Sequence, residues 1–195
     1  MTSPWRLALG DRFEALDPAL RAYFSEIPPG SVGRGRGVFE VVGTPRRWLW
    51  PLLAVLGRAG IVFPVWEHDV PFEVRNTPVG TAVRATIVFG FAHGHRVMRH
   101  AIGMTDRGLV DLLGTRGRLE TELRASVRDG RLELRSTRTL LCVGRWRFPI
   151  LAAPRVKLVE RAAGARQHVE LTLTAPIVGR LYEYAGTFEY SWEDA

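Results

Sequence analysis

The sequence predicts an α+β fold in which a strongly curved, mostly antiparallel β-sheet packs on one or two N-terminal helices. Apolar and polar residues alternate at period two in many segments after residue 68, and short turns separate those segments. Helical spacing is confined to the first 60 residues. Because an apolar sheet face this wide must curl or be covered, we expect eight or more strands in a half-barrel or barrel-like sheet. One domain over 1–195 follows, mainly helical with one early strand over 11–60 and a β-meander over 68–192.

Composition places the chain among globular proteins and narrows the classes of function. It has 195 residues, 46% of them hydrophobic and 24% charged, which is enough to bury a sizeable core. The net charge of +7 comes from arginines spread along the chain, and no nucleic-acid-binding motif is present, so we expect no nucleic-acid partner. A single cysteine, Cys142, excludes an internal disulfide framework. The start of the chain lacks signal-peptide features, which predicts a cytoplasmic protein.

The first element is an amphipathic helix over 11–26. Asp17 and Pro18 interrupt its pattern, which predicts two short helices with Asp17 capping the second. A glycine-rich stretch over 33–37 comes next. Since a dinucleotide-binding loop needs its glycines after a strand and before a helix, we interpret 33–37 as a flexible approach to a strand over 38–42.

A second helix is predicted over 45–59, with Thr44 as its N-cap and Pro45 in its first turn. From Trp48 to Trp66 the chain carries one charge, Arg58, but prolines and glycines make this stretch too short to cross a bilayer. We favour a buried helix laid across the sheet. The alternative is a lid or a peripheral membrane contact, made through Trp48, Trp50 and Trp66.

The clearest hairpin turns at Asp129-Gly130, because alternating segments over 119–127 and 132–140 flank this pair. A second hairpin over 83–104 turns near His93-Gly94 and brings His100 to the apolar face. A third turns at Gly164-Ala165. It sets Val156 opposite Leu173 and Leu158 opposite Leu171.

Polar residues on apolar faces are the informative exceptions. A buried guanidinium such as that of Arg138 needs a partner, a water or a ligand. Mostly apolar pockets with a few placed polar groups are typical of small-molecule sites. Arg138 has two other interpretations: a pair with a core carboxylate such as Asp69 or Glu160, or a position at the sheet end in contact with water. The candidate ligand-binding residues are Arg138, Thr121, Ser136, His100, Tyr182 and Tyr184.

Metal and nucleophile chemistry have little support. His93 and His95 are spaced to share a strand face, and His100 and His68 could join them, but spacing does not assemble the three or four ligands of a zinc site. No nucleophile elbow is present, and Cys142 lies between apolar residues. We expect neither a metal nor a cofactor.

Several short motifs occur in a recognisable order: 35–39, 68–72, 113–114, 148–154 and 179–186. In that order they resemble the bacterial family called domain of unknown function 4166, from about Leu16 to Phe188. In some bacterial proteins the family's domain is joined to a saccharopine-dehydrogenase-like oxidoreductase, so the resemblance implies such an enzyme as a partner. It assigns no catalytic residue. Where the family often has tryptophan before the arginine of its central strand, this chain has Val83 before Arg84.

Three functions follow as hypotheses. The first, which we favour, is non-catalytic binding of an apolar or amphipathic small molecule in a cavity under the sheet, with an arginine anchoring an acidic head group. The second is an isomerase-like or cyclase-like enzyme that uses His100 and a tyrosine. The third is an accessory module that binds an oxidoreductase.

Overall fold

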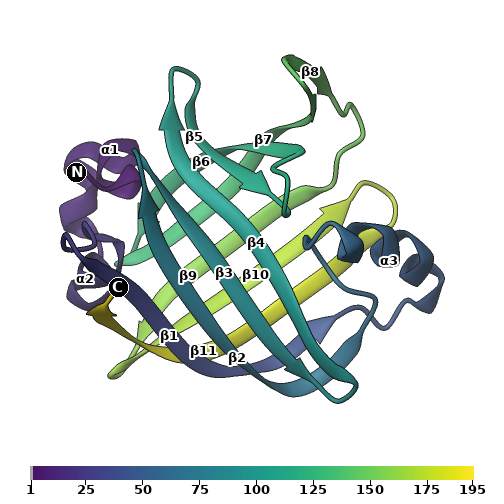
Figure 1. Ribbon diagram of the computed structural model, residues 1–195, viewed down its shortest axis with the longest axis horizontal. Helices are drawn as coiled ribbons and strands as arrows, with labels where there is room; N and C mark the ends of the chain where they lie inside the picture. Colours follow the sequence, from purple (N-terminus) through teal and green to yellow (C-terminus); the bar gives the residue numbers. More distant parts are fainter. Residues whose placement is uncertain (1) are drawn as a thin grey trace.

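A computed structural model describes residues 2–195, and its sheet closes on itself (Figure 1). The sheet order is β6-β5-β4-β3-β2-β1-β11-β10-β9-β7-β8, with every pairing antiparallel and a further pairing between β6 and β7. Within 2–195 this gives a ten-stranded barrel, to which β8 adds an outer hairpin strand. The predicted fold class is therefore confirmed. The strands are β1 (Ser31–Gly43), β2 (Trp66–Val79), β3 (Ala82–Phe91), β4 (Gly94–Thr105), β5 (Gly108–Leu113), β6 (Leu119–Arg128), β7 (Arg131–Val143), β8 (Trp146–Pro149), β9 (Arg155–Ala163), β10 (Arg166–Ala175) and β11 (Gly179–Asp194).

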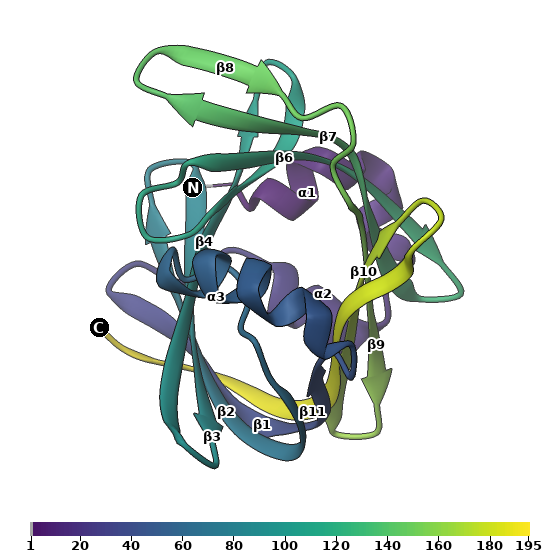
Figure 2. The same cartoon turned by 90° about the vertical axis from the view of Figure 1, so that its right-hand side faces the viewer.

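Helices cover both ends of the barrel, as Figures 1 and 2 show. At one end, Phe13 and Leu20 of the N-terminal helices pack against Leu109 and Leu132 of the barrel wall. At the other end, Leu53 belongs to the second core cluster, together with wall residues from several strands. The helical elements are α1 (Pro4–Leu9), η1 (Gly10–Ala15), α2 (Pro18–Phe24), η2 (Arg47–Leu49) and α3 (Trp50–Arg58).

The helix starts differ in how well the sequence predicted them. Asp17 caps α2 as predicted, because its carboxylate accepts a hydrogen bond from the backbone N–H of Ala19. The predicted start at Thr44 is wrong. The Thr44 hydroxyl accepts a hydrogen bond from the N–H of Arg46, which forms a turn, and the helical backbone begins at Arg47.

The glycines of 33–37 lie inside β1, so their interpretation as a flexible approach is wrong. They are small for a packing reason. A Cβ on Gly33 would lie 1.5 Å from the Tyr190 hydroxyl oxygen, and one on Gly35 would lie 2.9 Å from the Phe188 ring. Glycine in β1 thus lets the aromatic side chains of β11 cross over the neighbouring strand.

Two hairpin turns are confirmed and one is shifted. Asp129 and Gly130 both have positive φ, 50° and 74°, as a two-residue turn of this type requires. The hairpin at Gly164-Ala165 has the predicted register, with Leu158 opposite Leu171. The β3–β4 turn is at 92–93, which puts His100 opposite Ala85. Because the turn lies one residue earlier than predicted, each residue of β4 faces a β3 partner two positions away from the expected one, so each side chain stays on its predicted face.

A β-bulge in β7 overturns the predicted inner position of Arg138. Leu123 pairs with Ser136 and Glu122 pairs with Arg138, so Thr137 is an extra residue in β7. The extra residue reverses the alternation beyond it, and Arg138 is exposed. Arg138 lies with Arg155 in a surface hollow, and it does not line the barrel interior.

Candidate functional site

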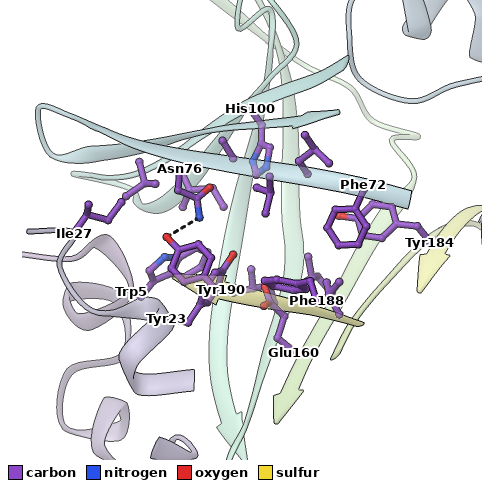
Figure 3. A pocket seen from close by; sticks show the side chains of 18 of the residues that line it. Trp5, Tyr23, Ile27, Phe72, Asn76, His100, Glu160, Tyr184, Phe188 and Tyr190 are labelled. Carbon is purple, nitrogen blue, oxygen red and sulfur yellow. Dashed lines mark hydrogen bonds between the residues drawn. The ribbon is translucent and has the colours of Figure 1, made fainter. Parts of the chain in front are cut away.

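A cavity of about 100 Å³ lies inside the barrel, between the two packed ends (Figure 3). Trp5 of α1 and Tyr23 of α2 line it from one side, and Phe39 and Phe72 line it from the strands. Most of the lining is apolar, as in small-molecule sites generally. The polar side chains of the lining are Ser25, Asn76, His100, Glu160 and the tyrosines Tyr23, Tyr184 and Tyr190.

His100 and Asp111 form a side-chain pair at one wall of this cavity. His100 of β4 lies opposite Leu113 of β5, and Asp111 lies two residues before Leu113 on the same inner face. The distance between His100 Nδ1 and Asp111 Oδ1 is 3.1 Å, and the side chains are 19% and 16% exposed. Burial is the largest influence on the pKa of His100 and lowers it, but the charge and hydrogen bond of Asp111 outweigh burial and raise this pKa above its ordinary value.

Glu160 of β9 is the second titratable group in the cavity wall. It is 6% exposed, and the side-chain amide of Gln167 donates a hydrogen bond to its carboxyl group. Burial raises the pKa of Glu160 to about 8, although the hydrogen bond from Gln167 and the nearby His100 oppose this shift. At neutral pH the Glu160 side chain is therefore mainly a neutral carboxylic acid, and it can donate a hydrogen bond.

Asn76 and Tyr190 supply a third polar position. The Asn76 amide nitrogen donates to the Tyr190 hydroxyl oxygen at 3.4 Å, and both side chains face the cavity (Figure 3). Burial raises the pKa of Tyr190, so its hydroxyl stays protonated across the physiological range. The rings of Tyr23 and Tyr190 meet edge to face with centroids 4.5 Å apart.

The structure brings two of the six predicted site residues to this cavity, His100 and Tyr184. Tyr182 is fully buried in the core cluster that includes Leu53 of α3. Thr121 is buried opposite Thr139, and the Ser136 hydroxyl accepts a hydrogen bond from the backbone N–H of Val156. None of these three lines the cavity, and neither does Arg138.

Sequence reasoning missed Asp111, Gln167 and Asn76, and treated Glu160 only as a partner for Arg138. The signal was present for Asp111, since it alternates with Leu109 and Leu113 on an apolar strand face. Glu160 likewise alternates with Leu158.

This arrangement can donate hydrogen bonds and move protons. With Nδ1 facing Asp111, the Nε2 atom of His100 is the ring nitrogen left to bind or titrate. Among residues 2–195, no group of three or more His, Cys, Asp or Glu side chains converges as a metal site would require. His93 and His95 are exposed at the β3–β4 hairpin.

These features define the class of protein: an antiparallel β-barrel domain with titratable side chains around an interior cavity. The chain belongs to the family described as Domain of unknown function (DUF4166), which matches residues 16–188, and the resemblance seen in the sequence is thereby confirmed. Comparison with curated proteins and with solved structures gives no match. In the part of the chain that the structure describes, no helix is both long and apolar enough to cross a membrane.

Proposed function

We propose that the barrel binds a small, mostly apolar molecule whose polar group faces His100 and Glu160. The observation that carries this proposal is the cavity itself, an apolar space with a few polar side chains converging on it. His100, Glu160 and Asn76 each have one partner in the protein and keep further hydrogen-bonding capacity, which a bound molecule could use. The outer position of Arg138 removes it as the anchor, and His100 takes that role in the proposal.

The size of the cavity limits the ligand. Its volume of about 100 Å³ is below the ~150 Å³ of an engineered cavity that binds benzene. The space therefore suits a group smaller than a benzene ring, such as a short chain, or one end of a longer molecule. Because His100 is held toward its protonated form and Glu160 toward its neutral form, both can donate hydrogen bonds. The polar group of the ligand is accordingly an oxygen acceptor, such as a carbonyl or a carboxylate.

Native mass spectrometry of protein purified from its own source tests the proposal. A stoichiometric small molecule that is lost in His100→Gln and retained in Arg138→Ala would support binding in the barrel. Arg138→Ala is the matched control because it removes an exposed charge on the outer wall. Protein that is empty in every preparation would contradict the proposal. Co-elution of empty protein with a dehydrogenase-like enzyme would favour the accessory-module hypothesis.

The His100–Asp111 pair favours a second candidate function, acid–base catalysis of the isomerase or cyclase type. A histidine oriented by a carboxylate at 3.1 Å is a common arrangement for proton transfer, and it lies at the cavity wall. In this candidate, Nε2 of His100 removes or delivers a proton of the bound molecule. Turnover of the molecule found above, with Asp111→Asn retaining binding and losing turnover, would favour catalysis over simple binding.

A further inference from the structure

The connecting segments at the α3 end of the barrel are basic. They are 44–65, 92–93, 114–118, 144–154 and 176–178, and they join strands at the end where α3 lies (Figure 1). These segments contain no aspartate or glutamate. The segments at the opposite end are mixed in charge, with acidic residues in excess. The arginines of the α3 end are Arg46, Arg47, Arg58, Arg116, Arg118, Arg145 and Arg147, and the charged residues of the opposite end are Asp11, Glu14, Asp17, Glu26, Asp106, Asp129, Arg6, Arg12, Arg21 and Arg107.

The outward face of α3 and the turn before it is apolar. Trp48, Leu52 and Val55 are spaced at i, i+4 and i+7 and are 66%, 57% and 60% exposed. The opposite face packs into the core through Leu49 and Leu53. A surface helix of a globular protein ordinarily turns a charged or polar face to water. Here both faces are apolar, and the arginines flank the helix.

The same end carries further exposed apolar side chains on separate segments. Trp146 and Phe148 of the β7–β8 hairpin are 60% and 51% exposed, and Leu151, which follows this hairpin, is 97% exposed. Ile177 in the β10–β11 connection is fully exposed. Figure 2 looks onto this end, with α3 in front and β8 standing away from the barrel wall. Exposed apolar patches of this kind mark interaction surfaces.

We propose that the α3 end docks on the surface of an anionic lipid bilayer, with α3 lying in the plane of the interface. Exposed apolar side chains on several loops, with arginines beside them, suit the boundary between the head groups and the acyl chains of a bilayer. The charge is complementary, since the connecting segments of this end have arginines and no carboxylates while anionic lipids carry the opposite sign. Arg147 pairs with Glu120 of β6, so the attraction rests on the other arginines. The inference does not depend on the proposed function of the cavity.

A hollow beside this end offers a place for lipid head groups. It has a volume of about 360 Å³ and lies between β7 and the segment that follows β8. Arg138 and Arg155 line it together with Ile150 and Leu151. This puts guanidinium groups next to exposed apolar side chains, which is the arrangement that a phosphate head group and its acyl chain require.

Co-sedimentation with phosphatidylcholine vesicles, with and without 30% phosphatidylglycerol, tests the proposal at physiological salt. We expect binding to the anionic vesicles and at least tenfold weaker partitioning for the triple variant Trp48→Ser, Leu52→Ser, Val55→Ser. Arg47→Gln and Arg58→Gln should each weaken partitioning about fivefold, which corresponds to ~1 kcal/mol per basic residue. The matched control is Leu7→Ser, a residue that is 50% exposed on α1 at the other end.

A second readout does not rely on altered binding. Brominated lipids should quench part of the tryptophan fluorescence of the bound protein, and Trp48→Phe and Trp146→Phe should each reduce the quenched part. The proposal is overturned by absence of vesicle binding, or by binding that the triple variant leaves unchanged. It is equally overturned if duplex DNA at the same salt binds more tightly than vesicles, or if the patch forms a dimer that the triple variant abolishes.

Discussion

Replacing Glu160 with glutamine should remove a pH dependence of stability that the barrel interior imposes. The folded protein raises the pKa of Glu160 from 4.5 to about 8. Between these values the folded state holds a proton that the unfolded state has released. The free energy of unfolding therefore falls as the pH rises, by about 1.4 kcal/mol per pH unit. Over the whole interval the loss is about 4–5 kcal/mol, an upper bound for one buried carboxyl group.

Urea unfolding of the wild type and of Glu160→Gln at pH 5, 7 and 9 measures this effect. Glutamine keeps the size of the side chain and cannot ionise, so the variant should gain stability relative to the wild type as the pH rises. The raised pKa of His100 contributes a slope of the same sign above pH 6.5. Asp111, which raises this pKa more than Glu160 does, remains in the variant, so most of the His100 contribution cancels in the comparison.

Glu170→Gln is the control, because it removes an exposed carboxylate from the same hairpin. It should change the pH dependence little. Equal slopes for the wild type and Glu160→Gln between pH 5 and 8 would refute the reasoning. That result would mean that Glu160 is solvated or already ionised in the folded protein.

Three further substitutions have defined outcomes. Asp111→Asn should lower the pKa of His100, because it removes the opposing charge while burial remains, and an NMR titration of the ring nitrogens measures the direction. Gly33→Ala should lower the free energy of unfolding by about 1–3 kcal/mol and displace Tyr190, whose hydroxyl oxygen lies 1.5 Å from the added Cβ. Urea unfolding measures this loss, and Tyr190→Phe in the same background should restore part of it. Phe13→Ala should lower the free energy of unfolding by about 3–5 kcal/mol in the same assay, because the fully buried ring of Phe13 packs the N-terminal helices against the barrel wall.

Local signals predicted the strand pairing well and the closure of the barrel less well. Asp129-Gly130 specifies its turn because both residues tolerate positive φ, so neighbouring residues alone determine that hairpin. β7 pairs with β9 although β8 lies between them in the chain, and no turn residue encodes this pairing. The bulge at Thr137 has no signal in the alternation, which is why Arg138 was placed on the wrong face.

The candidate site shows the same limit. Alternation could place His100, Asp111 and Glu160 on apolar faces, because side-chain period is a local property. Which of these side chains lie close together depends on the curvature of the barrel and on the helices that cover its ends. Trp5, for example, reaches the cavity from a helix that the sequence did not predict.

The free-energy cost of the polar side chains inside the barrel connects the fold to the proposed function. Closure gives every barrel strand two neighbours, so the fold does not need interior polar groups to complete its hydrogen bonding. Replacing buried ion pairs with apolar residues is often neutral or stabilising, which means that folding alone gives little reason to keep His100 beside Asp111. Glu160 costs stability at neutral pH, as its raised pKa implies. His100 and Glu160 line the same cavity, and in the proposed binding function a bound molecule uses both side chains.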